Sequence, residues 1–132
     1  MDAAAFHIEP SLPEPIYRQI AGQVLRMVAA GQCAPGAPLP SVRDMAAVHA
    51  VNPMTVSKAY AQLEAQGVLE RQRGKGMVVS QQAPRAQTPD QRLAALAPAL
   101  RELARQAREL DLPADKVAQA LQQMMNNERK SG

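Results

Sequence analysis

The sequence is poor in cysteine and histidine, and this scarcity excludes several kinds of site. Cys33 is the only cysteine among the 132 residues, so an intramolecular disulfide cannot form, and a reducing compartment, the cytoplasm, is favoured. The two histidines, His7 and His49, do not have zinc-ligand spacing, and the glycine-rich dinucleotide motif and the phosphate-binding loop are both absent. We therefore expect no metal, no cofactor and no enzymatic activity.

Long hydrophobic runs and aromatic residues are scarce as well. No apolar stretch approaches the roughly 18 residues of a membrane span, and the N-terminus lacks the pattern of a secretory signal, so we expect no membrane partner. Aromatic residues make up 2% of a chain that is 46% hydrophobic, a balance more typical of helices than of a β-sandwich. The formal net charge of +3 permits a nucleic-acid partner without requiring one.

The first forty residues predict one helix and a stiff connector. Apolar residues at helical spacing predict an amphipathic helix over residues 13–31, and Gly31 ends it. The connector over residues 32–40 contains three prolines and a glycine, so it cannot be helical. We expect Leu39 to anchor this connector in the core.

Two further helices follow, joined by a very short turn. Ser41 is a natural N-cap for the second helix, which must end near His49. Asn52 caps the third helix, Pro53 suits its first turn, and Gly67 ends it. Two helices connected in this way form a helix-turn-helix, with the third helix as the recognition helix.

A small β-hairpin completes this part of the chain. Residues 68–71 and 77–80 are predicted to be short strands, and the glycine-rich, basic segment 72–76 is predicted to join them. Three helices followed by a hairpin are the element order of a winged helix. We therefore predict a mainly α fold with a small β-hairpin, in which a winged-helix domain occupies residues 13–81.

The remaining residues are predicted to be helical and to pair with a second copy of the chain. Residues 82–88 are expected to be a linker, followed by a two-helix dimerisation region over residues 89–126, with Pro98 kinking or splitting its first helix. Apolar residues recur at steps of three and four, as in a coiled coil, although the same seam could pack back on the domain. The predicted dimerisation residues, called the seam residues below, are Leu93, Leu96, Leu100, Leu103, Leu110, Val117, Leu121 and Met124.

The winged helix carries polar and basic groups where a DNA duplex could meet them. Ser41 lies beside the free N–H groups of a helix start, which suit a phosphate, and Arg43 could contact a phosphate or a guanine edge. Each basic residue of this surface could instead be an ordinary solvated charge without a DNA contact. The predicted DNA-binding residues are Ser41, Arg43, Asn52, Met54, Thr55, Ser57, Lys58, Arg71, Arg73, Gly74, Lys75 and Gly76.

Four separated segments resemble the GntR family of bacterial transcription regulators. They are Pro40–Ala46, Val51–Tyr60, Leu63–Glu70 and Arg73–Gly76, and the resemblance covers about residues 13–80. The third-helix motif and the short helical tail resemble the YtrA subfamily, in which the winged helix is followed by only two helices that serve dimerisation.

The resemblance implies a homodimeric regulator, a repressor, that binds double-stranded operator DNA and controls its own operon or transport-related genes. The sequence does not indicate which small-molecule effector, if any, the protein binds. Many family members carry arginine where Pro53 and Ser57 stand, so Arg43, Lys58 and the hairpin are expected to supply more of the affinity here. The alternative function is a winged helix that binds another protein through residues 89–125.

Overall fold

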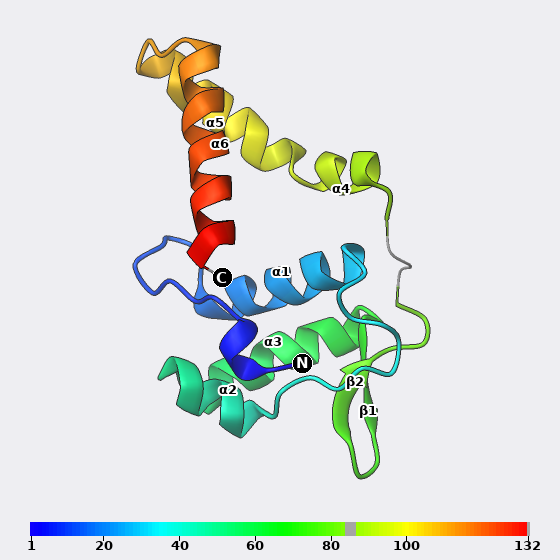
Figure 1. Cartoon of the computed structure of the whole chain (residues 1–132). Coiled ribbons are helices and arrows are strands. Elements are labelled where there is room, and N and C mark those ends of the chain that lie inside the picture. The colour runs from blue at the N-terminus through cyan, green and yellow to red at the C-terminus, as the bar shows by residue number, and fades with distance from the viewer. Residues whose placement is uncertain (84–86, 132) are drawn as a thin grey trace. The chain divides into compact units, whose positions relative to one another are not determined.

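The computed structural model describes residues 1–83 and 87–131, with side chains as far as Asn127. The chain divides into two compact units, Met1–Thr88 and Pro89–Gly132 (Figure 1). Part of the predicted linker, residues 84–86, lies outside the described residues. In the described part of the chain, no helix is both long and apolar enough to cross a membrane.

Three helices form the body of the first unit, as the sequence predicts. Ser41 accepts a hydrogen bond from the Asp44 N–H at 3.0 Å, and Asn52 accepts one from the Met54 N–H at 2.8 Å, so both predicted N-caps are confirmed. Ala50 ends the second helix in the left-handed conformation, with φ of 52°. The helices are α1 (Ile16–Ala29), α2 (Val42–His49) and α3 (Pro53–Ala65).

The hairpin pairs β1 (Leu69–Gln72) with β2 (Gly76–Val79) in antiparallel register, each within one residue of the predicted strand. The proline-rich connector, predicted only as a stiff link, lies along the other edge of β2. Leu39 donates its N–H to the Met77 carbonyl at 2.9 Å, and Val79 donates to Ala37 at the same distance. Both edges of β2 are thus hydrogen-bonded, and its residues from Met77 onward are buried.

The core of the first unit lies between α1 and α3. Ile20 and Val24 of α1 and Val56 and Leu63 of α3 are fully buried, and Met45 of α2 joins them. The buried residues of α1 (Ile20, Val24, Val28) and of α3 (Val56, Ala59, Leu63) recur at intervals of three or four, so each of these helices buries one face and leaves the opposite face to solvent. Leu39 is buried in the same cluster, which confirms its predicted role as an anchor.

An N-terminal arm, residues 1–15, packs on this core and was not predicted. It contains a single 3-10 turn, η1 (Ala3–Ala5), and buries Phe6. The side-chain amide of Gln19 exchanges two hydrogen bonds of 2.9 Å with the N–H and carbonyl of Glu9. Gln23, one turn further along α1, binds the N–H and carbonyl of His7 in the same way.

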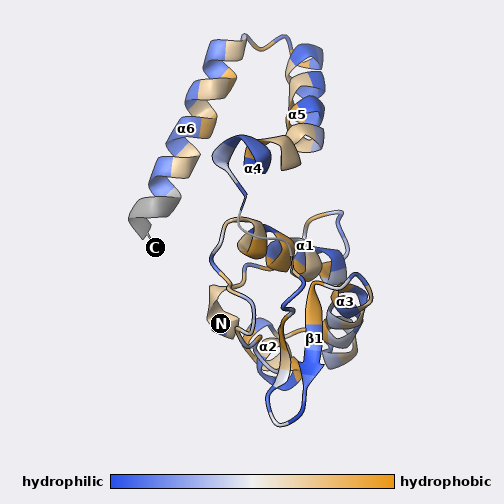
Figure 2. Cartoon of the chain, turned by 90° about the vertical axis from the view of Figure 1, so that its right-hand side faces the viewer, coloured by the Kyte–Doolittle hydropathy of each residue, from blue (hydrophilic) through white to orange (hydrophobic). Residues whose placement is uncertain are grey.

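The second unit consists of α4 (Pro89–Ala95), α5 (Ala97–Glu109) and α6 (Ala114–Ser131). The first predicted helix is split in two at Leu96, as Pro98 indicated, so the described residues contain three helices where the sequence analysis counted two. Figure 2 shows α5 and α6 diverging from the turn that joins them. None of the residues of α4 or α5 is buried.

The hydroxyl of Tyr60 on α3 links this helix to the proline-rich connector. Tyr60 is buried, and its hydroxyl donates a hydrogen bond of 2.7 Å to the Pro40 carbonyl. Tyr60→Phe leaves that carbonyl without its partner, so urea denaturation should show a loss of about 1–3 kcal/mol in the free energy of unfolding. Tyr17→Phe is the control, because no hydrogen bond of the Tyr17 hydroxyl occurs among the described residues. Equal losses in the two variants would contradict this assignment.

Candidate nucleic-acid interface

Three elements supply the twelve residues predicted to bind DNA. They lie at the start of α2, in the first two turns of α3, and in or beside the hairpin loop, residues 73–75. The hairpin loop projects beyond the helices (Figure 1). All twelve are exposed except Thr55, which is half-buried. The structure therefore leaves the predicted side chains accessible, and it distributes them over separate elements of one compact unit.

The start of α2 combines a cap with an accessible cation. The Ser41 oxygen accepts the Asp44 N–H, so the hydroxyl retains only its own proton for donation to a ligand. Arg43 is exposed and lines a shallow hollow between α2 and α3, together with Val42, Val51 and Pro53. Arg43 therefore lies beside the junction of α2 with the start of α3.

The start of α3 presents a large apolar side chain to solvent. Met54 is 78% exposed, although the other large apolar residues of this helix, Val56, Tyr60 and Leu63, are buried. The Asn52 oxygen is occupied by its cap hydrogen bond, which leaves its NH₂ group as the available donor. Ser57 and Lys58 continue the exposed surface into the second turn of the helix.

Lys58 has a neighbour that the sequence analysis missed. Its ammonium nitrogen lies 4.0 Å from the centroid of the Tyr17 ring, within the range of a cation–π interaction. Tyr17 is half-buried on α1 and packs against the core. No local pattern signals this contact, because the two residues belong to helices that are distant in the sequence.

The hairpin loop is shaped by two glycines at positive φ. Gly74 has a φ of 82° and Gly76 one of 74°, and a Cβ atom at either position would meet no other atom within 4 Å. The positive φ angles are therefore what favours glycine at these two positions. Lack of space is not the reason, since a side chain would meet no other atom there. The turn is closed by the Lys75 N–H, which donates to the Gln72 carbonyl at 3.1 Å.

Within the described part of the chain, no ion pair neutralises the five predicted DNA-binding cations, which are Arg43, Lys58, Arg71, Arg73 and Lys75. The ion pairs of the described residues lie elsewhere: His7 pairs with Glu9, and Arg105 pairs with Glu102 and Glu109. The cations near α2, α3 and the hairpin are therefore free to meet phosphate groups.

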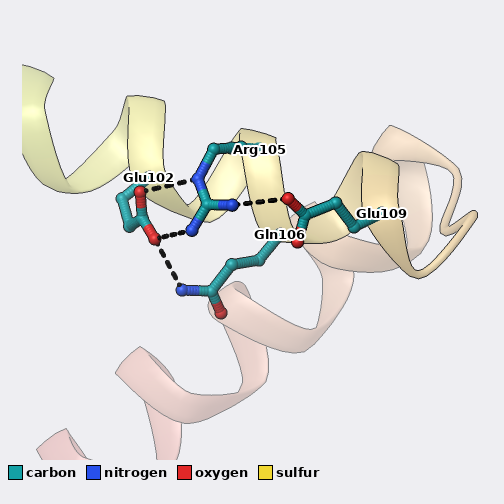
Figure 3. A network of polar contacts seen from close by, with 4 residues as sticks. All are labelled: Glu102, Arg105, Gln106 and Glu109. Atoms are coloured by element: carbon teal, nitrogen blue, oxygen red, sulfur yellow. Dashed lines mark hydrogen bonds and ion pairs between the residues drawn. The ribbon is translucent and has the colours of Figure 1, made fainter.

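A network of polar contacts lies on α5 of the second unit (Figure 3). Arg105 lies between Glu102 and Glu109, and Gln106 donates to Glu102 at 3.0 Å. The hydrogen bonds from Arg105 and Gln106 lower the pKa of Glu102 to about 2, so this carboxylate stays ionised at neutral pH. The network consists of contacts between residues three and four apart, which are neighbours on one helix face.

The seam residues remain accessible in the isolated chain. Seven of the eight are exposed, and Val117 is half-buried. Leu103, Leu110 and Val117 line an apolar hollow between α5 and α6, which Leu112 extends. The two helices thus display apolar side chains that the second unit itself does not cover.

Comparison with known sequences identifies relatives of the first unit. The family model described as bacterial regulatory proteins, gntR family, matches residues 16–79. The chain is 45% identical over 76 residues to the HTH-type transcriptional repressor YtrA of Bacillus subtilis (strain 168). That match covers 58% of this chain and spans 58% of the repressor's length, so it leaves part of both proteins unmatched.

Solved structures resemble the chain over most of its length. A transcriptional antiterminator from Listeria monocytogenes EGD-e is 30% identical, with a TM-score of 0.61, over 91% of this chain and 89% of that one. YtrA from Sulfolobus acidocaldarius, a GntR-family transcription factor, is 28% identical with a TM-score of 0.54, over 92% of this chain and 97% of that one. The likeness therefore extends beyond the winged helix into the helical second unit.

Proposed function

Because the chain belongs to the GntR family of bacterial regulatory proteins, we propose that it is a homodimeric, sequence-specific regulator of transcription, a repressor of the YtrA type acting in the cytoplasm. The family is one of transcription regulators. The observation that carries the proposal is the exposed start of α3, flanked by unpaired cations on α2 and on the hairpin. Nothing in the chain assigns an effector.

In this proposal α3 enters the major groove of operator DNA. Met54, at the tip of the helix, is placed to contact a thymine methyl group, while Ser57 and the Asn52 amide can donate hydrogen bonds to base edges or phosphates. Arg43 binds a phosphate or a guanine edge beside the start of α3. These contacts combine affinity from the phosphates with sequence reading from the bases.

The hairpin loop contributes a second contact, in the adjacent minor groove. Arg73 and Lys75 are exposed and unpaired on a loop that projects beyond the helices (Figure 1). Gly74 and Gly76 keep the loop free of side chains at the points where its backbone would approach the duplex. The loop would thereby hold the recognition helix in register.

The second unit is proposed to pair with the same unit of a second copy. A helical unit in which α4 and α5 bury no residue gains little hydrophobic stabilisation to offset its conformational entropy. The seam residues and the hollow between α5 and α6 supply the apolar surface that a second copy would cover. Pairing would place two recognition helices on two half-sites of one operator.

Selection of DNA by the purified protein tests the function directly. From a pool of randomised duplexes, the protein should enrich a sequence with two related half-sites whose centres lie about 10 base pairs apart, or a multiple of that distance. Binding of the selected duplex should survive excess nonspecific competitor. The logarithm of the affinity should fall with the logarithm of salt concentration, with a slope of about −0.9 per phosphate contact. Failure to enrich any sequence would favour the protein-binding alternative.

Arg43→Ala tests the contact assigned to α2. Loss of the guanidinium should weaken binding of the selected duplex by about 1–3 kcal/mol at fixed salt, as measured by gel shift. Arg26→Ala is the matched control, since it removes the same charge from the hollow beneath the N-terminal arm. Unchanged affinity of the Arg43 variant, or an equal loss in the control, would exclude a direct contact.

Leu100→Asp tests the proposed dimer. A carboxylate in the seam would have to be buried without a partner, so the variant should be a folded monomer that binds the selected duplex weakly. Leu25→Asp is the control, because Leu25 on α1 is 40% exposed and Leu100 is 41% exposed. Sedimentation velocity measures the mass of each variant. A Leu100 variant that keeps the wild-type dimer mass would contradict the seam assignment.

A further inference from the structure

We propose that Tyr17 is a positioning residue for DNA binding, whose ring holds the Lys58 ammonium on the outward face of α3 for contact with a DNA phosphate. This inference rests on the proposed function and extends it to a residue of α1. It is carried by the distance of 4.0 Å between the Lys58 nitrogen and the centroid of the Tyr17 ring.

The two partners differ in how firmly they are held. Tyr17 is half-buried and packs against the core cluster, and α1 itself packs on α3. Lys58 is exposed, and no ion pair engages it among the residues that the structure describes. The fixed ring can therefore restrict the long side chain of Lys58, which would otherwise sample many rotamers.

The chemistry of the partner matters for binding an anion. A carboxylate beside Lys58 would orient the ammonium, but it would also neutralise the charge and compete with a phosphate. The face of an aromatic ring attracts a cation through its quadrupole and carries no net charge. Tyr17 can therefore order Lys58 before DNA arrives while leaving the full positive charge available to the phosphate.

The contact between Lys58 and Tyr17 lies within the candidate DNA interface, because Lys58 belongs to α3. Lys58 lies in the second turn of α3, next to Ser57 and one turn beyond Met54, on the exposed face of the recognition helix. Tyr17 lies in the first turn of α1. The proposal thus extends the functional surface from α2, α3 and the hairpin to the start of the first helix.

A double-mutant cycle on the duplex selected by the wild-type protein tests the coupling. Lys58→Ala should weaken binding and reduce the salt slope by about one. Tyr17→Leu should weaken binding by about two- to fivefold, and this loss should vanish when Lys58 is already alanine. Tyr17→Phe, which keeps the ring and removes the hydroxyl, should bind like the wild type.

Two results of the cycle would overturn the proposal. If Tyr17→Leu weakens binding equally with and without Lys58, the ring acts only through the fold. If Tyr17→Phe binds as weakly as Tyr17→Leu, the hydroxyl is the active group. Thermal unfolding of each variant establishes that the comparison is between folded proteins.

Nuclear magnetic resonance of the free protein supplies a readout that does not involve DNA. Protons above an aromatic ring are shielded, so the ε-methylene protons of Lys58 should resonate upfield in the wild type and in Tyr17→Phe, and should lose this shift in Tyr17→Leu. Absence of the shift in the wild type overturns the inference alone. Failure of the wild type to select any DNA sequence overturns the proposed function and this inference together.

Discussion

The burial of one face of α3 against α1 is the constraint on which the rest of the first unit depends. Val56 and Leu63 are fully buried with Ile20 and Val24, which sets the rotation of α3 about its own axis. A helix with one face so placed must present the opposite face to solvent, and Met54, Ser57 and Lys58 are exposed there. Hydrophobic packing therefore determines which side chains of α3 are exposed and can contact a ligand.

Local signals in the sequence predict much of this arrangement because their physics is local. Ser41 and Asn52 cap helices through N–H groups two or three residues away, and Pro98 breaks a helix through its own ring. The ladder between the connector and β2 was not predictable in this way. Its residues lie among prolines, and their strand-like pairing exists only because the hairpin supplies an edge.

One residue at the candidate site, Tyr17, was missed for the same reason. Tyr17 has the spacing of an ordinary core residue of an amphipathic helix, and only the folded structure brings its ring to Lys58. An apolar seam was predicted from the periodicity of its residues, but periodicity alone does not say what covers them. The two units thus differ in kind: the first closes its own core, whereas α4 and α5 of the second bury nothing.

The paired glutamines of α1 determine how the N-terminal arm can change during evolution. Gln19 and Gln23 bind the arm through main-chain atoms alone, those of residues 7, 9 and 14, as a neighbouring β-strand would. Main-chain recognition does not depend on the identity of the side chains, so the residues at positions 7 and 9 can drift without loosening the arm. The arm therefore tolerates substitutions at positions 7 and 9, whereas Gln19 and Gln23 must keep the side-chain amides that hold it.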